Sequence, residues 1–277
     1  MQQVDLAIVI PTLNEEKYIG KLLDSIFAQT VWPKEVFVID AQSTDKTKEV
    51  VEKRKNLLAQ LHFIQIPKYT ISRQRNLGAR EASAEHILFL DADMKLEERD
   101  TLEKYMKEVG EKNPDIAVAS NLPLSTSWRD KVIFSHMNML IKASKPFWPW
   151  AVGMNIYVKR SSFNKVKGFD EEVRVAEDID LVQRMVREGL EFEFLNDPKI
   201  YTSVRRFIKE GRRRFLWKLV KNFVSIQRKG FKEAQIEYEF GEWKGLKKDR
   251  SMLERLFKQI EKQRFTQAIL KITRKVI

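Results

Sequence analysis

The sequence predicts an α/β fold in which a mixed, mostly parallel sheet is flanked by helices. Three observations predict it. Apolar runs of four or five residues alternate with segments of helical periodicity over about the first 120 residues. Three of these runs end directly in a proline or in aspartates, where a strand is expected to leave the sheet. Hydrophobic residues make up 43% of the 277 positions, which is enough for the core of one large domain.

The first half of the chain contains five expected strands and four expected helices. Each strand is a short apolar run, and the helices have apolar residues three and four positions apart. The strands are 6–10, 36–39, 63–66, 87–90 and 116–119, and the helices are 16–29, 46–58, 72–82 and 97–111. Ser72 is the expected cap of the third helix. Because helices separate consecutive strands, neighbouring strands are expected to be parallel.

The second half adds three expected strands and two helices before a long basic segment. Helical spacing of apolar residues covers 127–144, and a stiff aromatic loop follows at 145–150. The further strands are 154–158, 192–195 and 200–203. A helix is expected up to residue 188, with Asp178 either as its N-cap before Ile179 or in a functional role.

Polar residues follow three of the expected strands at the point where each strand ends. Pro11 and Thr12 follow the first, Asp40 ends the second, and Asp91 and Asp93 follow the fourth. The carboxyl ends of parallel strands share one edge of a sheet, where α/β proteins bind ligands. In extended backbone the two aspartates point to the same side, so a divalent cation is expected to neutralise them. A hydrated loop is the alternative for this pair.

Composition excludes several kinds of site. The chain has no cysteine, which excludes disulfides, a thiol nucleophile and thiolate metal ligands, and its three histidines argue against a zinc site. The N-terminus lacks the layout of a signal peptide, and no apolar stretch reaches the roughly 20 residues of a membrane span. The expected location is therefore cytoplasmic, with peripheral binding at the inner face of the cell membrane as an option.

Charge divides the chain at residue 205. Residues 205–277 contain 22 Lys and Arg against 8 Asp and Glu, whereas residues 1–204 carry a balance of −2. We therefore expect a domain at 1–204 and a basic, amphipathic helical tail at 205–277. Within the tail, helical spacing covers 216–226, and a second helix is expected at 251–277. The tail is expected either to bind an anionic membrane surface or to pack on the domain, and the absence of a recognisable motif argues against nucleic acid.

Five segments stand in an order that resembles a known family. They are IVIPTLNE at 8–15, VIDAQSTD at 38–45, RNLGA at 75–79, FLDAD at 89–93, and GFDE at 168–171 leading to Glu177 and Asp178. Together they resemble the family 2 inverting glycosyltransferases of the GT-A fold, a Rossmann-like sheet flanked by helices. The resemblance covers about residues 4–204, and there is some similarity to polyprenyl-phosphate sugar synthases.

The resemblance implies transfer of a sugar from a nucleotide-diphosphate donor, with Mg²⁺ or Mn²⁺ as cofactor. The acceptor would be a hydroxyl or phosphate, and a lipid-linked or membrane-proximal acceptor is one option. Asp178 would be the catalytic base, with Glu177 and Asp180 as alternatives. The remaining implied residues are Pro11, Thr12, Glu15, Asp40, Arg75 and Asp91 for the donor, Asp91 and Asp93 for the metal, and Trp150, Gly153, Asn155 and Glu177 on the acceptor side.

Three departures from the family pattern qualify these expectations. Ala41 and Gln42 replace an acid and a glycine of the usual second motif, and Lys95 stands where some relatives place a third metal contact. No histidine follows His136, which excludes a downstream histidine ligand. A nucleotidyltransferase-like enzyme is an alternative, but its Gly-rich phosphate loop is absent. A non-catalytic member that binds nucleotide-sugar or membrane is the other.

Overall fold

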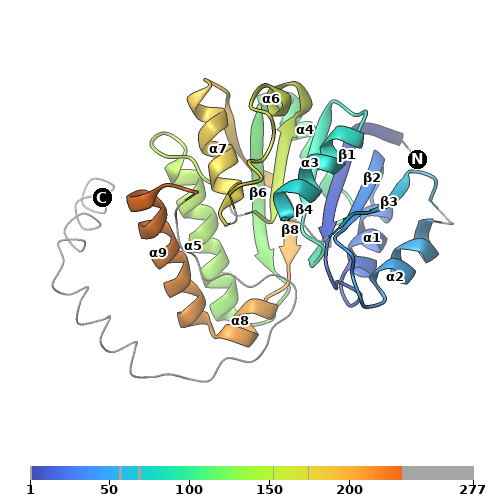
Figure 1. Ribbon diagram of the computed structural model, residues 1–277, viewed down its shortest axis with the longest axis horizontal. Coiled ribbons are helices and arrows are strands. Elements are labelled where there is room, and N and C mark those ends of the chain that lie inside the picture. The colour runs from blue at the N-terminus through green and yellow to red at the C-terminus, as the bar shows by residue number, and fades with distance from the viewer. Residues whose placement is uncertain (1, 56–57, 68–69, 152, 174, 233–277) are drawn as a thin grey trace. The chain divides into compact units, whose positions relative to one another are not determined.

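The structure, a computed structural model, describes residues 2–55, 58–67, 70–151, 153–173 and 175–232 (Figure 1). All of them belong to a compact unit that extends from Met1 to Tyr238. The second unit, Glu239–Ile277, lies outside the described residues, and so does the helix expected at 251–277.

The core of the compact unit is an eight-stranded sheet with the order β3-β2-β1-β4-β7-β6-β8-β5 (Figure 1). β1, β2, β3 and β4 are parallel, whereas β7 is antiparallel to β4 and β6, and β5 is antiparallel to β8. The strands are β1 (Gln2–Thr12), β2 (Val31–Asp40), β3 (Leu61–Gln65), β4 (His86–Leu90), β5 (Met94–Lys95), β6 (Ile116–Pro123), β7 (Asn155–Lys159) and β8 (Phe192–Thr202). This arrangement confirms the mixed, mostly parallel sheet.

Helices cover both faces of the sheet and form two hydrophobic cores. One core packs α1 (Ile19–Phe27), α2 (Thr47–Lys55) and α4 (Thr101–Lys112) against the sheet. The other contains side chains of α3 (Ile71–Glu81), α5 (Trp128–Ser144), α6 (Arg160–Lys165) and α7 (Glu177–Arg187). α8 (Arg205–Glu210) and α9 (Arg212–Lys229) follow β8, and Arg212 at the start of α9 pairs with Asp130 of α5 at 2.6 Å.

Alternation along the strands divides residues between the two cores. On β1, Leu6, Ile8 and Ile10 face the first core, whereas Ala7 and Val9 face the second. Because both faces are covered, the run is apolar throughout rather than alternating with polar residues, as parallel strands require. Burial on both sides is therefore why the sequence shows continuous apolar runs.

Helix α3 packs closely on β1 because residue 78 is a glycine. A Cβ at Gly78 would lie 2.3 Å from Cγ1 of Val9, closer than any real Cβ contact. The close approach brings α3 to the strand end that carries Thr12, and Gln74 Nε2 donates to the Thr12 carbonyl at 2.9 Å. The glycine at residue 78 therefore permits the close packing of α3 on β1.

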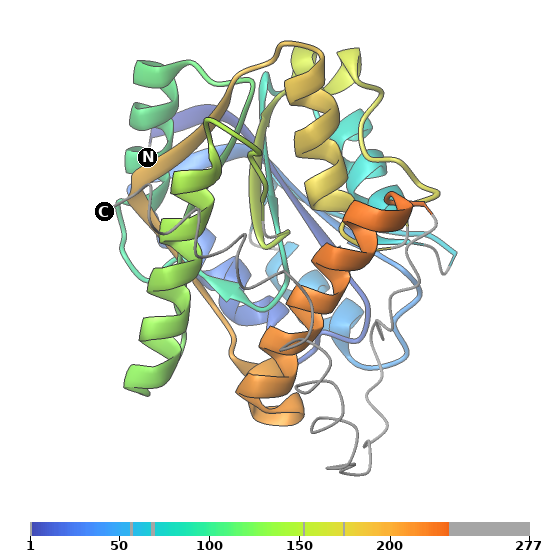
Figure 2. The same cartoon turned by 90° about the vertical axis from the view of Figure 1, so that its left-hand side faces the viewer.

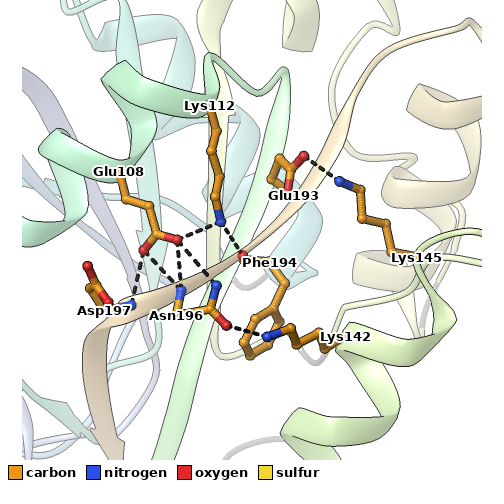
Figure 3. A network of polar contacts seen from close by, with 8 residues as sticks. All are labelled: Glu108, Lys112, Lys142, Lys145, Glu193, Phe194, Asn196 and Asp197. Atoms are coloured by element: carbon orange, nitrogen blue, oxygen red, sulfur yellow. Dashed lines mark hydrogen bonds and ion pairs between the residues drawn. The ribbon is translucent and has the colours of Figure 1, made fainter.

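β8 bends where Glu108 of α4 holds its backbone (Figure 3). The pairing with β6 jumps from Ala119–Leu195 to Ser120–Lys199, so residues 196–198 bulge from the ladder. The carboxylate of Glu108 accepts the amide hydrogens of Asn196 at 2.9 Å and Asp197 at 3.0 Å. The polar contacts are completed by Lys112, which donates to Glu108 and the Phe194 carbonyl, Lys142, which donates to Asn196, and Lys145, which pairs with Glu193 (Figure 3).

Four expectations about the elements are corrected. The strands predicted at 192–195 and 200–203 are one bent strand, and β5 and α6 are too short to have shown a periodicity. The cap of α3 is Thr70 rather than Ser72, because its hydroxyl accepts the amide hydrogen of Arg73. Helix α7 begins at Glu177 after Ala176, so Asp178 lies inside its first turn and is not the N-cap.

Candidate active site

The ends of β1, β2 and β4 meet at one edge of the sheet, as the sequence predicts. Thr12 pairs in register with Asp40, and its hydroxyl donates to Oδ1 of Asp40 at 3.0 Å. β4 lies on the other side of β1 and ends at Leu90, directly before Asp91. The three polar strand ends therefore belong to one site, and Pro11 lies buried within β1 beside Ile39.

Asp40 is fully buried and uses both carboxylate oxygens within the protein. Its oxygens accept hydrogen bonds from the hydroxyl of Thr12, from the hydroxyl and amide of Ser43, and from Nε2 of Gln65 at 3.0 Å. A carboxylate has about four acceptor positions, so this set fills them. Asp40 therefore fixes the side chains of Ser43 and the exposed Gln65 at the strand end, and a direct contact with a ligand would require one of these donors to move.

The loops after β1 and β2 are joined by reciprocal hydrogen bonds. The Asn14 amide donates to the Ser43 hydroxyl at 2.8 Å, and the Asn14 side chain accepts the amide hydrogen of Thr44 at 2.8 Å. The Glu15 amide donates to the hydroxyl of Thr47 at 2.8 Å. These contacts explain the hydroxyl residues of the second motif, since they hold the segment that carries Glu15 against the neighbouring loop.

Asp91 and Asp93 lie in a turn rather than in extended backbone. The Met94 amide donates to the Asp91 carbonyl at 3.2 Å, which corrects the assumption of an extended strand end. Loss of solvent raises the pKa of Asp93 from 3.8 to about 6, and the negative charges of Asp91 and Glu15 act in the same direction. Three carboxylates therefore contribute negative charge to one small region.

Arg205 supplies positive charge to this region. Its Nε lies 2.8 Å from Oδ2 of Asp93, and its two terminal nitrogens each lie 2.7 Å from the oxygens of Glu15. The guanidinium also stacks over the ring of Tyr18, at 4.6 Å from its centroid. The backbone after β8 holds Arg205 near Asp93. Ser203, two residues before Arg205, donates its amide hydrogen to the Asp93 carbonyl at 3.0 Å.

The oxygen donors fit a hard divalent cation. Asp93 is poorly solvated, and Asp91 and Glu15 add like charge, which a divalent ion would relieve. In the part of the chain that the structure describes, no group of three or more Asp, Glu, His or Cys side chains is arranged to hold a metal. The protein would therefore supply two carboxylates, Asp91 and Asp93, and other oxygens would complete the coordination.

A buried arginine joins this region to the first turn of α7. Arg75 of α3 is 1% exposed, and its guanidinium donates to Glu177 at 2.9 Å, to Asp91 at 3.0 Å and to the carbonyl of Gly153 at 2.7 Å. The ring of Phe169 lies against the guanidinium, at 5.3 Å from its centroid. Asn76, the next residue of α3, holds the Phe169 backbone through both atoms of its amide. The RNLGA and GFDE motifs are therefore in contact.

The carboxyl of Asp178 has a raised pKa. Desolvation, with the charge of Glu177 as a second cause, raises the pKa of this half-buried carboxyl from 3.8 to about 7. The amides of Ile179, at 2.9 Å, and Gly153 donate to it. A Cβ on Gly153 would lie 3.0 Å from Oδ2 of Asp178, so a glycine keeps this approach open. Asp180 instead forms an ion pair with Arg184 at 2.7 Å.

The other residues expected on the acceptor side differ in their positions. Trp150 is half-buried and packs on the second core, close in sequence to Gly153. Asn155 is fully buried in β7. Its side chain accepts a hydrogen bond from the Ala119 amide and donates one to the Asn121 side chain, both in β6. The structure therefore brings Gly153, Glu177 and Asp178 together but leaves Asn155 inside the sheet. Sequence reasoning missed Arg205 as a site residue, because its sequence context indicated only the start of the basic tail.

Comparison with known proteins gives the same class of fold. Residues 7–166 match the family model Glycosyl transferase family 2. A dolichyl N-acetyl-α-D-glucosaminyl phosphate 3-β-D-2,3-diacetamido-2,3-dideoxy-β-D-glucuronosyltransferase of Methanococcus voltae is 27% identical over 74% of this chain and 70% of its own length. The glycosyltransferase GlyA of Streptococcus pneumoniae is 30% identical over 42% of this chain, and the match spans only 16% of that protein.

Two kinds of solved structure resemble the fold. S. aureus TarS in complex with UDP has a TM-score of 0.58 and 22% identity, covering 86% of this chain and 67% of the TarS chain. The mannosyltransferase PcManGT of Pyrobaculum calidifontis, in complex with GDP-Man and Mn²⁺, has a TM-score of 0.63 and 23% identity, covering 82% of this chain and 65% of that chain. This likeness supports the GT-A arrangement of the sheet and its helices.

Proposed function

This chain belongs to glycosyl transferase family 2, and from that premise we propose that it transfers a sugar from a nucleotide-diphosphate donor to an acceptor hydroxyl or phosphate. The observation that carries the proposal is the buried guanidinium of Arg75, which contacts both Asp91 and Glu177. Arg75 thereby links Asp91, which is suited to binding a metal at the donor diphosphate, with the first turn of α7. That turn carries Asp178, which is suited to removing a proton. The two halves of a transfer reaction lie in one site.

Asp178 is the proposed base. Its carboxylate accepts the proton of the acceptor hydroxyl while the acceptor oxygen forms a bond to the anomeric carbon. The bond from that carbon to the diphosphate oxygen breaks, and its electron pair leaves with the nucleoside diphosphate. Attack from the face opposite the leaving group inverts the configuration. With its pKa raised to about 7, Asp178 is a stronger base than an exposed aspartate and is still partly ionised at neutral pH.

Asp91 and Asp93 are the proposed ligands of Mg²⁺ or Mn²⁺. When bound, such an ion supplies Lewis-acid stabilisation of the charge that develops on the diphosphate. Arg205 holds a further positive charge beside Asp93, while Lys95 is paired with Glu97 at 2.8 Å and cannot ligate a metal while protonated. PcManGT, which resembles this chain in fold, has been solved in complex with GDP-Man and Mn²⁺, and this supports a divalent ion in the proposed site.

The nucleoside is assigned to the joined loops after β1 and β2. Thr12 and Asp40 hold the ends of β1 and β2 together through their hydrogen bond. Glu15, in the loop after β1, binds Arg205. The acceptor is assigned to the side of Trp150, Gly153 and Glu177. A lipid-linked acceptor is part of the proposal because the Methanococcus voltae relative is named for a dolichyl phosphate substrate. Residues 1–204 are the proposed catalytic domain, to which the tail contributes Arg205.

Calorimetry with UDP-GlcNAc and GDP-Man, each with and without Mn²⁺, tests this function. We expect one donor to bind in the presence of Mn²⁺ and to bind at least about tenfold more weakly to Asp93→Asn. Asp197→Asn is the matched control, because Asp197 is an exposed aspartate on the bulge of β8. A donor that binds Asp93→Asn as well as wild type, with or without Mn²⁺, would refute the metal role. Absence of binding to a broad panel of nucleotide sugars would refute the donor class.

A further inference from the structure

Helix α5 has an apolar outer face in addition to the face that packs on the sheet. Its buried side chains are Ile141, which is 2% exposed and belongs to the second core, and Phe134, which is 4% exposed and packs with Val204 and Phe207. On the outside, Trp128 is 68% exposed and Met139 is 58% exposed. Val132, also exposed, lies on the same side, since the three positions fall within about 40° around the helix axis. Leu140, about 80–120° further around the axis, and Phe147, in the segment after the helix, are also exposed, Phe147 to 88%.

The exposed charged side chains of α5 and of the segment directly after it are all positive. Arg129, Lys131, Lys142 and Lys145 are exposed on α5 and directly after it. The only acidic residue of the helix is Asp130, which is 1% exposed and accepts hydrogen bonds from Arg212 of α9 at 2.6 and 3.1 Å. Pairing with α9 therefore withdraws the one negative charge of α5 from the surface.

The positions of the neighbouring elements add to this surface. Ile208 of α8 is 77% exposed, and α8 begins at Arg205. The C-terminal end of α5 is followed by the segment that contains Phe147, Trp150 and Gly153. Gly153 lies beside Asp178. α5 and α9 both lie on the side of the described part of the chain that faces the viewer in Figure 2 and is at the left in Figure 1.

We propose that the outer face of α5, with Phe147, docks on the surface of an anionic lipid bilayer. A helix that exposes both apolar side chains and Lys or Arg places the apolar side chains at the boundary between head groups and acyl chains. Its Lys and Arg bind the anionic head groups. Large exposed apolar side chains in one patch mark an interaction site. In the sequence analysis a membrane role was expected only of the tail helix, whereas the structure assigns it to a helix of the catalytic domain.

Charge favours a bilayer over a second copy of the chain. A symmetric dimer through this face would bring Arg129, Lys131 and Lys142 of one copy against the same cations of the other, which opposes association. Among the helices that the structure describes, none combines the length and apolar character needed to cross a membrane. The proposed contact is therefore with the surface of the bilayer.

Co-sedimentation of the full chain with vesicles tests the proposal. The vesicles contain either phosphatidylcholine alone or equal parts of phosphatidylcholine and phosphatidylglycerol. We expect binding to the anionic vesicles, reduced about 100-fold or more in Arg129→Glu/Lys131→Glu. Trp128→Ser/Met139→Ser should bind the anionic vesicles at least about tenfold more weakly than wild type, because its apolar contacts with the bilayer are removed. Thermal unfolding of both variants, expected to match wild type, shows that they are folded.

The control reverses the same number of charges on another helix. Lys48→Glu/Lys53→Glu changes two exposed lysines of α2, which lies on the opposite face of the sheet. We expect this variant to retain most of the binding. Equal losses in the control and in Arg129→Glu/Lys131→Glu would overturn the proposal, as would wild-type binding by the α5 variants or no binding by wild type. A dimer in light scattering that Trp128→Ser/Met139→Ser disperses would overturn it in favour of a second copy.

Discussion

Nε of Arg205 forms an ion pair with Oδ2 of Asp93 over 2.8 Å, although Arg205 begins α8 and Asp93 directly precedes β5. The same guanidinium engages Glu15 through both terminal nitrogens. A monovalent side-chain cation thus lies against two carboxylates in the region where we propose that a divalent cation binds. Arg205 and the metal should therefore compete for the charge of Asp93, and this competition can be measured without a donor.

Replacing Arg205 by glutamine should strengthen the effect of Mn²⁺ on stability. The substitution leaves Asp93 and Glu15 without their shared cation, so Mn²⁺ gains a larger share of their charge. We expect Mn²⁺ to raise the Tm of Arg205→Gln by about 3 °C more than that of wild type. Arg213→Gln, an exposed change on α9, is the control and should behave as wild type. An equal or smaller Mn²⁺ shift in Arg205→Gln would contradict the competition.

Removing the guanidinium of Arg75 should destabilise the fold strongly. Arg75→Met leaves Glu177 and Asp91 without their buried partner, and breaking a buried ion pair costs about 3–5 kcal/mol. Urea denaturation measures the loss. Adding Glu177→Gln should restore part of the stability, because it removes the unpaired charge. Arg80→Met, on the exposed side of α3, should change stability little. Equal stability of Arg75→Met and wild type would refute a linking role for this residue.

Gly78→Ala should destabilise the protein, whereas Gly110→Ala should not. The added methyl at residue 78 meets Val9 at 2.3 Å, and overpacking of this kind costs about 1–3 kcal/mol. Gly110 lies on helix α4 with nothing within 4 Å of the added methyl, so there alanine should stabilise by about 0.5–1 kcal/mol. Val9→Ala in combination with Gly78→Ala should recover part of the loss. A neutral Gly78→Ala would show that α3 does not need the close approach.

The raised pKa of Asp178 predicts a pH-dependent loss of stability. The carboxyl ionises near its usual 3.8 in the unfolded chain but at about 7 in the folded one. The folded state therefore holds the proton longer, and this group lowers stability as pH rises between these values. Asp178→Asn should have a higher Tm than wild type at about pH 8 and a similar Tm at about pH 4. The opposite order would mean that the carboxylate is stabilised rather than desolvated.

The meeting of three strand ends at one edge of the sheet was predictable because it depends on local pattern. Burial on both faces makes β1 and β4 continuous apolar runs, and the polar residue that follows each run marks the carboxyl end. Thr12, Asp40 and Asp91 could therefore be assigned to one edge. Gly78 was also predictable, since a helix that packs on a strand at this distance has no room for a Cβ.

Features that depend on distant contacts could not be predicted. β5 has two residues and exists because it pairs with the bent end of β8, which Glu108 holds from another helix. Arg205 enters the site through that bend, whereas its sequence context suggested only the start of a basic tail. Thr70 and Ser72 have equivalent chemistry as helix caps, and the backbone geometry alone selects Thr70.

Single-turnover transfer by Asp178→Asn is the most direct test of the proposed site. Once calorimetry has identified the donor, the variant is mixed with labelled donor, acceptor and Mn²⁺, and both bound donor and transferred sugar are measured. We predict donor affinity within about threefold of wild type and transfer reduced by at least about 100-fold, because the acceptor hydroxyl has lost its base. Asp197→Asn should transfer at the wild-type rate. Transfer by Asp178→Asn at the wild-type rate would contradict the assignment of Asp178 as the base.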